Sequence, residues 1–202
     1  MRRAAYAACA AVAVAVAGCG EREEPQPSTR PAETADPLPE LPRKWSRHVN
    51  GRAGFAIGLP PRWSARDRRR SSLIRSPDHL AAVTVSADRS EGGLALPLDE
   101  FATRVADALK GFRGLRTKDP RPFRARYDAV AVTGSGRAAK GGVPQRVLVV
   151  VERRAGLATY TAVVATNAKR ASGRNRDEIR RMLRSIRGRP AKAGDQRSGR
   201  SG

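Results

Sequence analysis

The sequence predicts an α+β domain in which an antiparallel β-sheet is covered by helices. Short segments that alternate apolar and polar residues are separated by turn signals, three long apolar-rich segments follow in its second half, and an amphipathic segment stands on either side of those three. Each amphipathic segment has one apolar stripe, which must be buried against the sheet. We expect one domain over residues 44–188.

The first half of the domain predicts four short strands. Asn50-Gly51 and Pro77-Asp78 are turn signals that separate two pairs of alternating segments. Pro60-Pro61 ends the second segment, since proline cannot donate to a sheet ladder. The expected strands are residues 45–49, 54–59, 72–75 and 80–87.

A helix is predicted over residues 98–110. Its apolar side chains recur at spacings of three and four, which places them on one side of a helix. Asp99 and Glu100 fall in the first turn and Gly111 follows the end, as the helix dipole and the C-cap preference favour. The stripe comprises Leu98, Phe101, Val105, Leu109 and Phe112, and residues 113–122 are expected to form a loop.

Three long strands and a closing helix complete the prediction. The strands are expected at residues 127–137, 145–153 and 157–166, and the continuous apolar run 147–151 is typical of a strand buried on both faces. The helix is expected over 175–186, with Asp177 and Glu178 in its first turn. Its stripe comprises Ile179, Met182, Leu183 and Ile186, and residues 189–202 read as a disordered basic tail.

Residues 1–18 are typical of an export signal. Arg2 and Arg3 precede a run of about 15 residues that is nearly all Ala and Val. This run is shorter than the ~20 residues that a transmembrane helix needs. A removed signal is therefore favoured over a permanent membrane span.

Val16-Ala17-Gly18-Cys19 resembles the lipobox of bacterial lipoproteins. The resemblance implies that Val16, Ala17 and Gly18 are recognised by a signal peptidase and that Cys19 carries a diacylglyceryl group with palmitate-type chains. Two acyl chains anchor a protein stably, whereas one does not. The alternative is an ordinary signal with a chance cysteine.

Residues 19–43 are predicted to form a disordered tether. The segment is rich in Pro and acidic residues and has too few large apolar side chains to offset chain entropy. Its purpose would be to hold the domain away from the bilayer. An arm packed on the domain stays an alternative near Leu38 and Leu41.

The chain is strongly basic. It has 40 Lys and Arg against 19 Asp and Glu, a formal net charge of +21. Such a charge attracts polyanions, and anionic lipid or wall polymer is a better candidate than nucleic acid for a domain outside the cytoplasm. The densest cluster is Arg66, Arg68, Arg69 and Arg70, although a solvated loop and a compositional bias towards Arg are alternatives.

No catalytic, metal or cofactor motif is found. His48 and His79 lack metal-ligand spacing, and Cys9 and Cys19 both lie outside the domain. The serines lack a Gly-x-Ser-x-Gly elbow, and Gly92-Gly93 reads as a turn. A Ser-His-Asp group assembled from distant segments stays open, because its members meet in space.

The order of elements resembles the PsbP-like superfamily, and within it the LpqN-type lipoproteins. The resemblance rests on GFAIGLPPRW (54–63), PLDEF (97–101), the three long strands and IRRMLRSIRG (179–188). It implies an α/β/α sandwich in a non-enzymatic accessory or binding protein. We expect an extracytoplasmic, membrane-anchored envelope protein that binds a ligand or another envelope protein. The alternatives are an envelope hydrolase with a dispersed site and a secreted polyanion-binding protein.

Overall fold

The computed structural model describes residues 40–188. The predicted signal 1–18, most of the tether 19–43 and the tail 189–202 lie outside the described residues, and so does Cys19. None of the helices in the described part has the length and apolar character needed to cross a membrane.

The described chain is mostly β-structure with few helices. The elements in chain order are β1 (Ser46–Asn50), β2 (Phe55–Leu59), β3 (Ser64–Asp67), β4 (Ser71–Arg75), β5 (Ala81–Asp88), α1 (Glu91–Ala95), α2 (Leu98–Asp107), β6 (Phe112–Thr117), β7 (Arg121–Pro122), β8 (Asp128–Ala138), β9 (Pro144–Arg154), β10 (Ala158–Asn167), α3 (Gly173–Arg184) and β11 (Arg187–Gly188).

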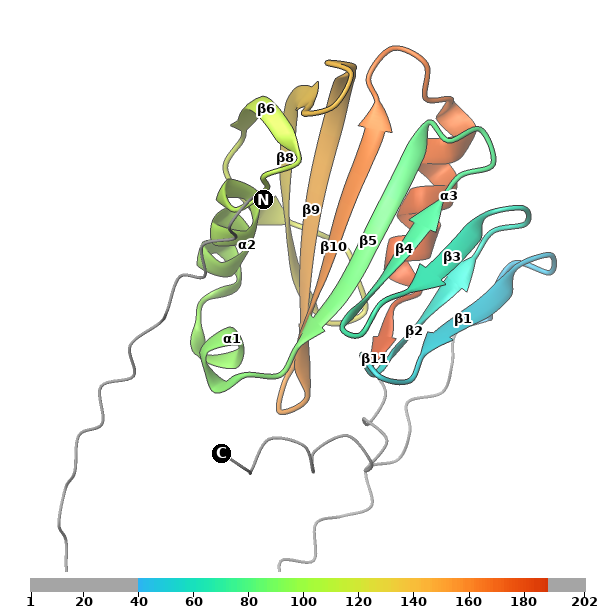
Figure 1. Ribbon diagram of the computed structural model, residues 1–202. Helices are drawn as coiled ribbons and strands as arrows, with labels where there is room; N and C mark the ends of the chain where they lie inside the picture. The colour runs from blue at the N-terminus through green and yellow to red at the C-terminus, as the bar shows by residue number, and fades with distance from the viewer. Residues whose placement is uncertain (1–39, 189–202) are drawn as a thin grey trace, which may run out of the picture. The chain divides into compact units, whose positions relative to one another are not determined.

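The strands form two antiparallel sheets (Figure 1). The eight-stranded sheet has the order β3-β4-β5-β10-β9-β8-β6, with β7 also paired to β8, and the three-stranded sheet has the order β1-β2-β11. Strand β9 pairs along nearly its whole length with both β8 and β10. The predicted antiparallel sheet is confirmed, and the helices cover less of it than expected.

Strand β9 is buried on both faces, as its apolar run predicts. Val147, Val149 and Val151 pack with Ala102 and Ala106 of α2 on one side. The side chain of Val150 points to the opposite side, because successive residues of a strand alternate, and joins the larger core. Two separate cores therefore meet at this strand.

The larger core lies between the main sheet, α3 and the three-stranded sheet. Phe55 and Ile57 of β2 and Met182 of α3 are at most 1% exposed there. Trp63 is 5% exposed, and its indole N–H donates to Glu178 Oε2 of α3 at 2.8 Å. Helices α2 and α3 thus lie on opposite faces of the sheet (Figure 1).

Two segments predicted as a loop and a turn are regular structure, so both predictions are wrong. Residues 113–122, predicted as a loop, contain β6 and β7; a register shift between Arg113 and Arg116 hides the strand period. Gly92-Gly93, predicted as a turn, lies in the short helix α1, whose cap is the Ser90 side chain. A Cβ on Gly93 would lie 2.6 Å from the Asp88 carboxylate, so this helix needs glycine there.

The first hairpin is held by a buried asparagine. Asn50 is 2% exposed and ends β1, and the turn follows it. Its amide donates to Ser71 O and Ser72 Oγ, both at 3.1 Å, while Oδ1 accepts from Ala53 N at 2.9 Å. This side chain joins the β1–β2 turn to the β3–β4 hairpin.

The segment before the first strand contacts the domain through Leu41 and Trp45. Gly58 of β2 leaves room for the Leu41 side chain, because a Cβ there would lie 2.7 Å from Leu41 Cδ2 and 3.2 Å from the Trp45 ring. The packed-arm alternative is therefore the arrangement found at Leu41.

Strand β6 approaches its neighbour β8 closely at two glycines, beside the register shift between Arg113 and Arg116. An added Cβ would lie 2.9 Å from Arg116 O at Gly134, and 3.1 Å from Leu115 Cα at Gly136. These obstacles belong mostly to the backbone, which cannot rotate away. The glycines therefore permit the close approach that places the chain after β6 over the edge of the sheet.

We expect Gly134→Ala to lower the free energy of unfolding by about 1–3 kcal/mol, because the methyl group overpacks a backbone contact. Gly92→Ala is the matched control, since nothing lies within 4 Å of its Cβ position. Denaturant unfolding followed by Trp fluorescence measures both. Equal stability of the two variants would contradict the close approach of β6 as the reason for glycine at position 134.

Candidate functional site

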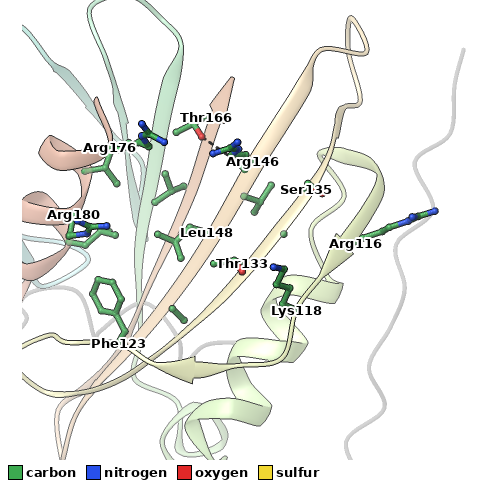
Figure 2. A pocket seen from close by; sticks show the side chains of 16 residues that line it. Arg116, Lys118, Phe123, Thr133, Ser135, Arg146, Leu148, Thr166, Arg176 and Arg180 are labelled. Carbon is green, nitrogen blue, oxygen red and sulfur yellow. Dashed lines mark hydrogen bonds between the residues drawn. The ribbon is translucent and has the colours of Figure 1, made fainter. Parts of the chain in front are cut away.

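A groove of about 570 Å³ lies between α3 and the β8–β9–β10 part of the main sheet (Figure 2). This volume is typical of small-molecule sites. Its lining combines apolar, hydroxyl and basic side chains and contains no carboxylate. The lining residues are Arg116, Lys118, Phe123, Ala131, Thr133, Gly134, Ser135, Arg146, Val147, Leu148, Val164, Thr166, Arg176, Ile179, Arg180 and Leu183.

Strand pairing makes the floor of the groove change from polar to apolar along the strands. Ser135, Arg146 and Thr166 are paired neighbours and form a polar row. Two residues further along, Thr133, Leu148 and Val164 form a mixed row. In the next row, Ala131 lines the groove, and its paired neighbours Val150 and Ala162 belong to the buried core.

One wall of the groove is α3. The Ser172 hydroxyl caps this helix by accepting from Asn175 N at 3.2 Å. Ile179 and Leu183 belong to its buried stripe, and Arg176 and Arg180 line the groove beside them.

The predicted first turn of α3 is corrected. The helix begins at Gly173, so its first turn holds no acidic residue. Asp177 and Glu178, which were expected there, come one turn later. The carboxylate found at this end of the helix is that of Asp78, which accepts from Asn175 Nδ2 at 2.9 Å and is favoured there by the helix dipole.

The opposite wall comes from the chain between β6 and β8. Lys118 N donates to Thr133 O at 2.8 Å, and Phe123 N donates to Ala129 O at 2.9 Å. These bonds fix the segment along the edge of β8, so that the side chains of Lys118 and Phe123 reach the groove.

The groove has basic side chains without acidic partners. Among residues 40–188, the side chains of Arg116, Lys118, Arg146, Arg176 and Arg180 form no ion pair with a carboxylate. Figure 2 shows Arg116 extending away from the others. The remaining four give the groove a positive potential that an anion would neutralise.

The basic cluster predicted from the sequence, at residues 66–70, lies outside the groove. Arg66 lies in β3, which corrects the expected loop, and Arg68, Arg69 and Arg70 form the β3–β4 turn. All four are exposed. Strand β3 is the edge of the sheet opposite to β6, so the cluster does not join the groove. The lipobox residues Val16, Ala17, Gly18 and Cys19 lie outside the described residues.

His48, Asp67 and Ser72 meet in space. His48 Nε2 lies 2.8 Å from Asp67 Oδ1, and the Ser72 hydroxyl donates to the same oxygen at 2.6 Å. The carboxylate stands in the middle, whereas a catalytic triad needs the histidine between serine and carboxylate. Ser72 is also 0% exposed. The cluster joins β1 to β3 and β4.

His79 is exposed and has a positive φ of 57° in the turn before β5. The neighbouring Asp78 accepts from Ser76 Oγ at 2.5 Å and from Asn175 Nδ2 at 2.9 Å. Chiefly the bond from Ser76 lowers the pKa of the Asp78 carboxyl. In the described part of the chain, no group of three His, Cys, Asp or Glu could hold a metal ion.

Glu152 is a buried acid that the sequence reading did not single out. It is 2% exposed and accepts from Tyr127 N at 3.1 Å. Burial raises the pKa of Glu152 to about 7, although the Tyr127 bond and the charges of Arg187 and Arg126 oppose the shift. Its paired neighbour Tyr160 is 1% exposed, and burial raises the pKa of that phenol to about 12.

Two sequence signals could have located these residues. Position 152 has the same parity as Leu148 and Val150, so an acid there must face the core side. Arg176 and Arg180 are spaced by four and adjoin the apolar stripe of the last helix. Neither signal shows which residues of other strands or helices face these side chains, so the sequence does not predict the groove.

Glu152→Gln should remove a pH dependence of stability. A folded-state pKa raised from 4.5 to about 7 stabilises the fold fully below pH 4.5, and this stabilisation is lost as pH rises through 7. We expect the wild type to lose roughly 2–3 kcal/mol relative to the variant across that window.

Denaturant unfolding from pH 4 to 8 measures the difference. Glu100→Gln, at an exposed position of α2, is the control and should follow the wild type to within about 0.5 kcal/mol. Parallel profiles for wild type and Glu152→Gln would contradict the raised pKa.

Comparison with solved structures shows the same fold in proteins of low sequence identity. A Bacteroides thetaiotaomicron VPI-5482 protein aligns over 73% of this chain and 49% of its own, with 13% identity and a TM-score of 0.54. The Saccharomyces cerevisiae Ran-binding protein Mog1p aligns over 71% of this chain and 95% of its own, with 7% identity and a TM-score of 0.50. This chain thus spans about half of the Bacteroides protein.

A third structure is LpqN of Mycobacterium tuberculosis, described as involved in cell envelope biogenesis. It aligns over 72% of this chain and 91% of its own, with 16% identity and a TM-score of 0.45. This lower score adds no weight to the comparison. The sequence matches no model of a protein family, and no curated protein matches it. The likeness to the first two structures therefore concerns the fold alone.

Proposed function

We propose that the protein is a lipoprotein of the cell envelope whose domain binds a ligand without catalysis. A diacylglyceryl group on Cys19 anchors it outside the cytoplasm, and residues 19–39 serve as the tether. The sequence resemblance to PsbP-like, LpqN-type proteins supports this proposal, because it implies an accessory or binding role.

The groove beside α3 is the observation that carries the binding function. Its volume of about 570 Å³ suits a small molecule, and the apolar part of its floor adjoins four basic side chains that the described carboxylates leave unpaired. Basic side chains at a concave surface attract an anionic ligand. Because these side chains have no carboxylate partner, no ion pair has to be broken when the ligand binds.

A hydrolase is the weaker alternative. The closest arrangement to a triad in the described residues is His48, Asp67 and Ser72, and there the serine proton is directed to the carboxylate. Asn50 donates to the same hydroxyl at 3.1 Å. These two hydrogen bonds indicate that the Ser72 hydroxyl stabilises the hairpin.

Cys19→Ala should move the protein from the membrane fraction to the soluble fraction, because anchoring of this kind depends on the acyl chains. Cys9→Ala is the control and should stay with the membrane, since Cys9 precedes the cleavage site. Fractionation and mass spectrometry of the mature N-terminus measure the outcome. A soluble wild type, or an unmodified Cys19, would overturn the anchor.

A photoreactive residue in the groove should capture the ligand in intact cells. Thr133 is suitable because it is exposed and lines the groove. Thr103, exposed on α2, is the matched control outside it. We expect an adduct at position 133 and none at 103 by mass spectrometry. The same products at both positions, or no adduct at 133, would contradict binding in the groove.

A further inference from the structure

The floor of the groove is polar at one end and apolar at the other, and Lys118 and Arg180 stand at the sides of its apolar part. On the sheet side, the row of Arg146 and Thr166 gives way to the row of Ala131. On the helix side, Arg176 precedes Leu183 by two turns. Figure 2 shows Arg146, Arg176 and Thr166 at one end, Leu148 in the middle and Phe123 at the other end, with Arg180 near Phe123 and Lys118 near Thr133.

We propose that this groove holds a monomeric anionic lipid. Its phosphate or carboxylate lies between Arg146 and Arg176, and its acyl chain runs over Leu148 towards Phe123. This inference rests on the proposed binding function and names the class of ligand for the same groove.

The polar end requires a negative charge. Arginine binds phosphate and carboxylate through paired N–H groups, and Arg146 and Arg176 come from different elements, so they can hold a headgroup from two sides. The lining contains no carboxylate that could occupy them instead. The first turn of α3 holds no acidic residue of its own, and the Asp78 carboxylate that reaches it is bonded to Asn175.

The apolar end requires a hydrocarbon chain. Phe123 is held over it by the bond from its backbone N–H to Ala129 O at 2.9 Å. Ala131, Leu148 and Leu183 offer no hydrogen-bond partner through their side chains, so a sugar phosphate would lose hydration there without compensation. An acyl chain gains free energy on entering such a surface.

Titration calorimetry on the purified full chain tests the two requirements separately. The three probes are lauroyl lysophosphatidylglycerol, lauroyl lysophosphatidylcholine and glycerol 3-phosphate, with both lysolipids below their micelle concentrations. The first probe has both a negative charge and an acyl chain, the second has the chain without net charge, and the third has the charge without a chain. We expect saturable one-to-one binding of lysophosphatidylglycerol, at least about tenfold tighter than either other probe.

Two variants with equal changes of charge locate the headgroup. Arg146→Gln with Arg176→Gln should weaken lysophosphatidylglycerol binding by at least about tenfold. Arg181→Gln with Arg184→Gln removes the same charge from exposed positions of α3 outside the groove and should change binding less than about threefold. Thr133→Trp, which fills the groove without changing charge, should also abolish binding.

Several results would overturn the proposal. Equal affinity for glycerol 3-phosphate would mean that the groove recognises charge alone, as expected if its ligand were an anionic wall polymer. Equal affinity for lysophosphatidylcholine would mean that no headgroup is selected. Equal weakening by both arginine pairs would reflect the overall charge of the chain. If the calorimetry fails but the crosslinked adduct at position 133 is still found, the groove binds a ligand of another class. If no adduct is found at position 133, the proposed binding function itself is wrong.

Discussion

Burial of β9 on both of its faces is the constraint on which the rest of this structure depends. A strand with valine at every position from 149 to 151 cannot leave either face in water without a large loss of apolar burial. The sheet must therefore be covered on two sides. Helix α2 covers one face over β8 and β9, and α3 with the three-stranded sheet covers the other.

The second covering layer is incomplete, and the groove is the consequence. Helix α3 and strand β2 pack on side chains of β5, β10 and the middle of β9. The adjoining part of β8 and the start of β9 stay open to the groove. The two glycines of β8 complete this arrangement, because they let β6 approach closely, and the chain after β6 then brings Lys118 and Phe123 to the open edge.

The scarcity of carboxylates shapes the charge of the groove. Several of the few acids have structural partners: Glu178 with Trp63 and Arg174, Asp67 with His48 and Ser72, and Asp78 with Asn175. None of these three acids lines the groove, and their contacts join strands or fix α3. The basic residues of the groove therefore have no carboxylate partner among residues 40–188, whatever the origin of the high arginine content.

The sequence by itself determined the antiparallel α+β class, the long strands, the two amphipathic helices and the doubly buried run, because these follow from local periodicity. It missed β6, where a bulge breaks the period of two, and α1, where a serine cap and a tight glycine outweigh the turn preference of Gly92-Gly93. It singled out Arg66 to Arg70 because they are adjacent in the chain. Only the tertiary structure brought Arg146 and Arg176 to one end of a groove, since they come from a strand and a helix whose packing no local pattern records.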